Sequence, residues 1–140
     1  MSEILLVTRL LLDFGLLVLI WIVQLIIYPG FAYYTQDQLL IWHSKYTTFI
    51  TIIVMPLMLG QLALYSIQLF LHIDVYVLII WVLIVLIWSA TFLQAVPLHN
   101  KIAQNKNKNN IIVNKLIKIN WLRTVLWTMV FAFSVLSAIF

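Results

Sequence analysis

Cysteine is absent from the 140 residues of this chain. Its absence excludes disulfide bonds, thiolate metal sites and thiol redox chemistry. It also separates the chain from the small four-helix membrane enzymes that work through paired cysteines. Any binding or catalytic role must therefore rest on histidine, carboxylate, amide, hydroxyl or arginine side chains.

Charged side chains are scarce as well. Only 9% of the residues are charged, with eight basic and four acidic side chains, and 65% are apolar. Soluble domains carry about 25% charged and roughly 45–50% apolar residues, so this chain has too few charges to cover a water-facing surface. We expect an integral membrane protein in which residues 1–140 form a single transmembrane domain.

Four apolar segments are long enough to cross a bilayer, which takes around 20 helical residues. We place these helices at about residues 5–28, 36–71, 75–97 and 115–139. The short link between the second and third helices makes them antiparallel neighbours. The expected fold is therefore all-α, a bundle of four antiparallel transmembrane helices.

The expected breaks between these helices carry recognisable signals. Pro29 and Gly30 should end the first helix, and Thr35 with Gln38 forms a capping box for the second. Only the three residues from His72 to Asp74 separate the second helix from the third, and the Asn/Lys-rich stretch from Asn100 to Asn114 should be a loop.

Basic residues are distributed unevenly between the two sides of such a bundle. Seven would lie on the side of the first and third links, and only Arg9 on the other. Because cytoplasmic segments are enriched in Lys and Arg, both termini should lie outside the cell, in the cytoplasmic (inner) membrane. The same rule explains the net charge of +4 without a nucleic-acid partner. The seven residues are Lys45, Lys101, Lys106, Lys108, Lys115, Lys118 and Arg123.

Polar side chains gather at the cytoplasmic ends of all four expected helices. Buried polar groups in a membrane are expensive and usually face the bundle interior, so we predict a ligand-binding site there. Arg123 should point inwards, towards Gln24 and Thr91 or Gln94, and an arginine with neutral partners suits a carboxylate, phosphate or phenolate. The predicted site residues are Gln24, Tyr28, His43, Thr91, Gln94, His99, Asn100, Asn120 and Arg123.

Each of these residues also has a simpler explanation. Gln24, Gln94 and Asn120 can hold helices together through hydrogen bonds, and His43 and His99 are typical interfacial residues. No metal site is predicted, although the two histidines could ligate a metal or haem. Haem and quinone are the cofactors to consider, and neither is required by the residues.

Arg9 and Asp13 form a second polar pair, four residues apart in the first helix. This spacing lets the two side chains meet on one face, so we expect an ion pair that eases membrane insertion. The alternative is that Asp13 serves as a proton or cation site.

Four short motifs carry a resemblance to known proteins: "QLIIYPGF", "WHSKY", "TFLQAVPLHN" and "NWLRTVLW". Together they resemble a group of small bacterial four-helix membrane proteins, similar to the anthrone-oxygenase-like domain of unknown function, whose third helix tends to end in a "VPxN"-like turn. The resemblance implies a four-helix bundle and oxygen or redox chemistry on an aromatic compound. His99, Asn100, Asn120 and Arg123 would carry that chemistry.

Three functions remain open from the sequence. The first is a small-molecule site for an anionic or aromatic ligand in the cytoplasmic half of the bundle, with a redox enzyme as its catalytic form. The second is a non-catalytic membrane subunit or scaffold. The third is a small dimeric transporter that uses Asp13. The expected partners are the lipid bilayer, the small ligand, and a second copy or another membrane protein.

Overall fold

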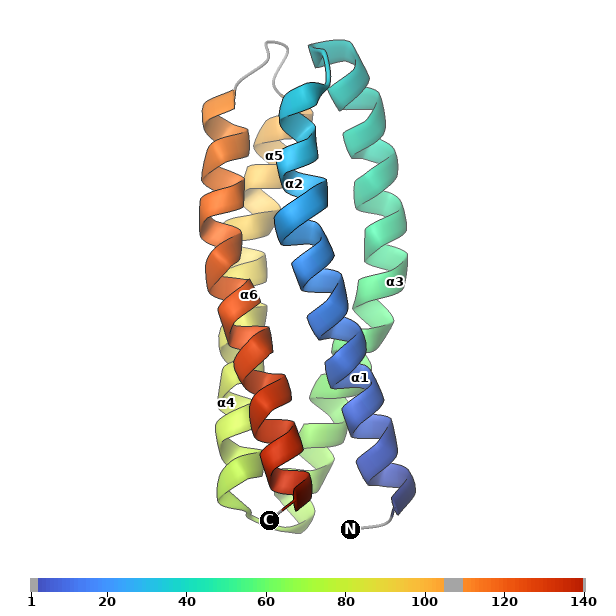
Figure 1. Cartoon of the computed structure of the whole chain (residues 1–140), viewed down its shortest axis with the longest axis vertical. Helices are drawn as coiled ribbons and strands as arrows, with labels where there is room; N and C mark the ends of the chain where they lie inside the picture. The colour runs from blue at the N-terminus through green and yellow to red at the C-terminus, as the bar shows by residue number, and fades with distance from the viewer. Residues whose placement is uncertain (1–2, 105–109, 140) are drawn as a thin grey trace.

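The computed structural model describes residues 3–104 and 110–139, and every regular element within these ranges is helical. Four helical stretches are long and apolar enough to cross a membrane: Glu3–Tyr33, Gln36–Leu71, Val75–Gln104 and Asn110–Ile139. They lie side by side, with the two chain ends at the same end of the molecule (Figure 1). The expectation of an all-helical chain with four such helices is confirmed.

The first stretch consists of α1 (Glu3–Ile22), the π-helical η1 (Val23–Ile27), α2 (Tyr28–Gly30) and the 3₁₀ turn η2 (Phe31–Tyr33). The second is a single helix, α3 (Gln36–Leu71), with the predicted bounds. The third is built from α4 (Val75–Ala90), the π-helical η3 (Thr91–Ala95) and α5 (Val96–Gln104), and the fourth is α6 (Asn110–Ile139).

Three predicted helix ends are wrong, because the chain stays helical beyond residues 28 and 97 and becomes helical before residue 115. Apolar residues in the supposed loop regions explain the extensions. Phe31, Ile102 and Val113 are all buried in one apolar cluster, so burial favours helix where the local Asn, Lys and Gly content does not. The middle of the expected loop, with Lys106 and Lys108, lies outside the described residues.

Two prolines, Pro29 and Pro97, each follow a π-helical segment. In each case a five-residue π segment ends two residues before the proline: Val23–Ile27 before Pro29, and Thr91–Ala95 before Pro97. A proline in a helix lacks an N–H donor and crowds the carbonyl of the preceding turn. A wider π turn just before it relieves both problems, so each helix continues instead of stopping. Such π turns are frequent at functional sites.

The predicted capping box at the start of α3 is confirmed. Thr35 and Gln38 exchange side-chain and backbone hydrogen bonds, with the Thr35 N–H donating to Gln38 Oε1 at 3.2 Å. At the start of α4, the Asp74 carboxylate accepts the N–H groups of Tyr76 and Val77 at 2.8 and 3.1 Å. Each cap satisfies backbone donors that a helix start leaves free.

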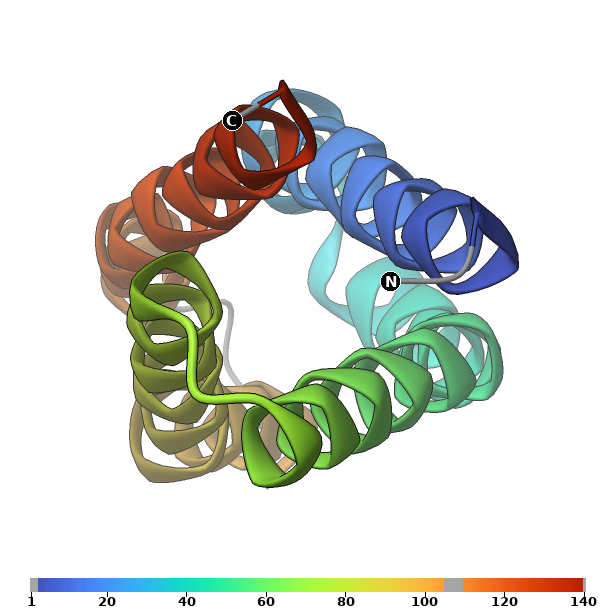
Figure 2. The same cartoon turned by 90° about the horizontal axis from the view of Figure 1, so that it is seen from below.

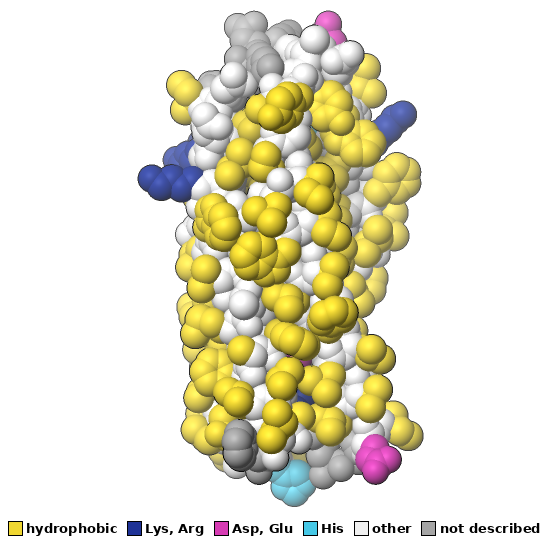
Figure 3. Space-filling model, in the orientation of Figure 1, with side chains coloured by type: hydrophobic (Ala, Val, Ile, Leu, Met, Phe, Trp, Pro, Cys, Tyr) yellow, Lys and Arg dark blue, Asp and Glu magenta, His cyan; other side chains and the backbone are white. Residues whose placement is uncertain are grey.

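The packing follows a simple cycle, in which α1 contacts α3 and α6, and α4 contacts the same two helices. Figure 2 shows the four stretches arranged around a common axis. Two apolar clusters fill the interior, one around Ile84 and Trp127 and one around Phe31 and Leu116. The face shown in Figure 3 is apolar over most of its length, with Lys and Arg side chains projecting near one end.

Candidate functional site

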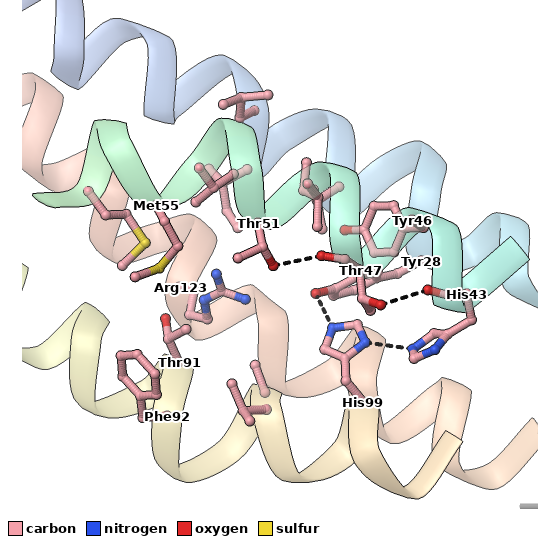
Figure 4. Close-up of a pocket in the computed structure, with 18 of the residues that line it drawn as sticks. Tyr28, His43, Tyr46, Thr47, Thr51, Met55, Thr91, Phe92, His99 and Arg123 are labelled. Atoms are coloured by element: carbon pink, nitrogen blue, oxygen red, sulfur yellow. Dashed lines mark hydrogen bonds between the residues drawn. The ribbon is translucent and has the colours of Figure 1, made fainter. Parts of the chain in front are cut away.

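A cavity of about 400 Å³ lies inside the helical assembly. Its walls come from all four stretches, with α3 on one side and η3 and α5 on the other, while α1, α2 and α6 complete the lining. This volume falls in the range of about 300–1,000 Å³ that small-molecule sites occupy. Figure 4 shows that polar and apolar side chains converge on this space.

Arg123 is the charged group of the cavity. It extends from α6 into the space between α3 and η3 (Figure 4) and is only 8% exposed. Its Nη1 donates to Asn120 Oδ1 at 3.1 Å, and its guanidinium lies 5.5 Å from the centroid of the Trp127 ring, a distance that permits a cation–π interaction. The predicted inward orientation of Arg123 is confirmed.

Two amide side chains, Asn120 and Gln24, support Arg123 through a series of hydrogen bonds. Asn120 Nδ2 donates to Gln24 Oε1 at 2.8 Å, and Gln24 Nε2 donates to the Ile117 carbonyl at 3.4 Å. Both amide side chains are buried, and neither lines the cavity. Gln24 and Asn120 thus orient the arginine, as interhelical hydrogen bonds do in membrane proteins.

No acidic side chain neutralises Arg123. The four acidic residues of the chain all lie in its described part, and none of them lines the cavity or hydrogen bonds to Arg123. The buried Nε of Arg123 also has no hydrogen-bond partner among the described residues. A buried cation with neutral partners in an apolar setting is costly, so the site favours an anion that would supply the missing charge.

Three aromatic and imidazole groups form a second polar feature at one end of the cavity. The hydroxyl of Tyr28 hydrogen bonds with His99 Nε2 at 2.9 Å, and His99 Nδ1 hydrogen bonds with His43 Nε2 at 2.9 Å. These residues come from α2, α5 and α3, and Figure 4 shows them as one connected row. Such a row can pass a proton between its members, because each imidazole can act as donor and acceptor.

The histidine pair does not fit a haem held between the two rings. Two nitrogens on opposite sides of an iron would be about 4 Å apart, given metal–nitrogen bonds of about 2 Å. The facing nitrogens of His43 and His99 are 2.9 Å apart and bond to each other instead. Within the described residues, no cluster of three or more His, Asp or Glu side chains could hold a metal.

The other predicted site residues divide into two groups. Thr91, with its hydroxyl bonded to the Ile87 carbonyl at 2.8 Å, lines the cavity, and Asn100 lies at its exposed edge. Gln94 is exposed and does not line the cavity, so the expectation that it would face Arg123 is wrong. Gln94 and His99 are five residues apart, about 140° around a regular helix, so the side of the stretch that brings His99 to the cavity leaves Gln94 outside it.

Several lining residues were not predicted. Ser44 and Thr51 follow one face of α3 together with Thr47, and Met55 and Met58 continue the same wall. The signal was available in the spacing of the hydroxyl residues, three and four apart, which places them on one side of a helix. This spacing alone does not indicate a site, because hydroxyl side chains in a helix bond readily to their own backbone, as Thr47 does to the His43 carbonyl at 2.9 Å.

Arg9 and Asp13 are both buried and lie in a separate polar cluster. The Asp13 carboxyl group accepts hydrogen bonds from Gln61 Nε2 at 2.7 Å and from the Tyr65 hydroxyl at 2.6 Å. Arg9 donates to the Ser137 hydroxyl at 2.6 Å and to Ser134 O at 3.3 Å. Among the described residues, Arg9 and Asp13 bond to these groups of α3 and α6 and not to each other. The expected local pair is replaced by bonds across helices.

Comparisons with protein families, with curated proteins and with solved structures found no match for this chain. The resemblance carried by the four motifs therefore remains a prediction. The cavity itself combines an arginine without an acidic partner, a row of groups that can carry a proton, and an apolar remainder.

Proposed function

We propose that the chain is an integral protein of the cytoplasmic (inner) membrane, folded as an antiparallel bundle of four transmembrane helices with both termini outside. The four long apolar helices support the membrane location. The excess of Lys and Arg at the end that holds the first and third links supports the orientation.

We further propose that the cavity binds a small anionic or aromatic molecule. The observation that carries this proposal is the position of Arg123, which is buried in the cavity wall with no acidic partner. The ligand's carboxylate, phosphate or phenolate would accept hydrogen bonds from the guanidinium, which is well suited to such groups. Trp127, next to Arg123, adds an aromatic surface for the ligand.

The row of Tyr28, His99 and His43 suits this site to acid–base chemistry. A phenol bound near Arg123 could transfer its proton to the Tyr28 oxygen while Tyr28 passes its own proton to His99 Nε2. The phenolate that remains is stabilised by Arg123 and is the form from which an electron is most readily removed. The reaction that we propose for this site is therefore an oxidation of the bound phenolate, in which an external oxidant such as oxygen or a quinone accepts the electron.

Equilibrium dialysis of labelled 2-naphthoate against the protein in nanodiscs tests the binding proposal. We expect saturable binding that Arg123→Gln weakens by at least tenfold. Lys118→Gln is the matched control, because it removes the same charge from the exposed face of the same helix. Equal binding by Arg123→Gln and the wild-type protein, or equal loss in both variants, would contradict the proposal and favour a scaffold.

Transport through Asp13 is not favoured by the geometry. Asp13 does not line the cavity, and both of its carboxyl oxygens are occupied by Gln61 and Tyr65. These bonds support a role for the cluster in holding α1, α3 and α6 together.

A further inference from the structure

The cavity has two chemically different ends. The change from one end to the other falls at Met55 and Arg123: Figure 4 shows Met55 on one side of Arg123 and the His99–His43 pair on the other. Met58 belongs to an apolar cluster with Leu16, Ile20 and Trp127, and all four residues line the cavity. A ligand that fills this space must therefore combine a polar group with an apolar body.

The polar end lies at the level of the exposed lysines. His43 precedes Lys45 by two residues, and His99 precedes Lys101 by two, so each histidine is within about 3 Å of a lysine along its helix axis. Arg123 is about 8 Å deeper than Lys118 by the same count. Since lysines mark the membrane–water boundary, the cavity runs from the head-group level towards the centre of the bilayer.

The cavity opens sideways, between α3 and the η3–α5 stretch. The lining residues at this boundary are exposed, notably Thr51 on α3 and Phe92 and Asn100 on the opposite side. The lining residues on α6, Arg123 and Trp127, are buried. In a membrane this boundary faces lipid, so the route into the cavity leads from the bilayer.

The volume limits the size of the occupant. At about 400 Å³, the cavity is near the lower end of the range for small-molecule sites. This volume matches one acyl chain or one ring system next to the polar group.

From these four features, and resting on the proposed function, we infer that the ligand is a membrane-dissolved amphiphile with one anionic head and one apolar tail. It enters between α3 and η3–α5, places its head at Arg123 and directs its tail towards Met58 and Trp127. A molecule in this position keeps the orientation that it had in the bilayer, with its head towards the boundary and its tail towards the centre.

Displacement of cis-parinarate, a fluorescent single-chain carboxylate, from the protein in nanodiscs tests this inference. Tryptophan-sensitised emission reports the bound probe, and the part lost in Arg123→Gln measures binding at the site. We expect dodecanoate to displace that part. Methyl dodecanoate, which keeps the tail but has no charge, and acetate, which keeps the charge but has no tail, should each be at least tenfold weaker.

The outcomes separate this inference from the proposed function. Arg123-dependent binding of 2-naphthoate without displacement of parinarate by dodecanoate would overturn the amphiphile and leave the anion site standing. Displacement by acetate at the potency of dodecanoate would identify a water-soluble anion and also overturn it. Loss of all Arg123-dependent binding, for 2-naphthoate and for parinarate, would overturn both proposals.

The route is tested separately by stopped-flow measurement of parinarate binding. Thr51→Trp places a bulky side chain at the sideways opening, and we expect it to slow association at least fivefold. Thr48→Trp is the matched control, because Thr48 is exposed on the same helix and does not line the cavity. An unchanged rate in Thr51→Trp, or equal slowing in both variants, would overturn the lateral route.

Discussion

Tyr65→Phe should destabilise the protein by removing one hydroxyl group from the buried cluster around Asp13. Tyr65 is 0% exposed, and its hydroxyl lies 2.6 Å from Asp13 Oδ2 and 3.0 Å from the Ser134 hydroxyl oxygen. Phenylalanine keeps the ring and its packing but leaves a carboxyl oxygen without its donor, in a place that water does not reach.

The expected loss in the free energy of unfolding is about 1–2 kcal/mol. An unsatisfied buried polar group costs about 1–3 kcal/mol, while interhelical hydrogen bonds measured in a membrane protein average about 0.6 and reach about 1.7 kcal/mol. Asp13 retains the bond from Gln61 at 2.7 Å, so the loss should stay well below the range for a fully unpaired charge.

Reversible unfolding in mixed detergent micelles, followed by circular dichroism, measures this loss. Tyr33→Phe is the control, since Tyr33 is 91% exposed and the change should alter stability by less than about 0.5 kcal/mol. A double-mutant cycle with Asp13→Asn should show coupling between the two positions. A Tyr65→Phe protein as stable as the control, or strictly additive effects in the cycle, would refute the hydrogen-bonded cluster.

Further predictions concern the arginine support, the π turns and the orientation. Asn120→Ala should weaken Arg123-dependent binding of 2-naphthoate severalfold, because Arg123 loses the acceptor at 3.1 Å; the dialysis assay measures it, and unchanged affinity would contradict the supporting role. Pro97→Ala should let the helix revert towards a regular α-helix and shift His99 away from Tyr28, which a high-resolution structure of the variant would detect; an intact η3 would show that proline is not its cause. Because the chain has no cysteine, a single His72→Cys should react with a membrane-impermeant maleimide added outside intact cells while Asp37→Cys does not, and the reverse pattern would invert the proposed topology.

Much of the fold could be predicted because it depends on local pattern and composition. Apolar runs of sufficient length specify helices in a bilayer, since only a helix satisfies every backbone group within one segment. The start of α3 followed from Thr35 and Gln38. The convergence of Tyr28, His43, His99 and Arg123 followed from counting residues from the same helix ends.

What the sequence alone determined, then, was the helical class, the four long apolar segments and the approximate position of each polar residue along its helix. The tertiary structure decided which faces of the helices meet. In the third stretch, the face that lines the cavity carries His99 and not Gln94. Asp13 bonds to Gln61 and Tyr65 instead of its neighbour on α1, because donors across a helix interface can surround a buried carboxyl group more completely than one side chain four residues away. Which face of a helix points inwards, and which groups bond across an interface, depend on contacts between residues that are distant in the sequence. A local sequence pattern does not specify these contacts.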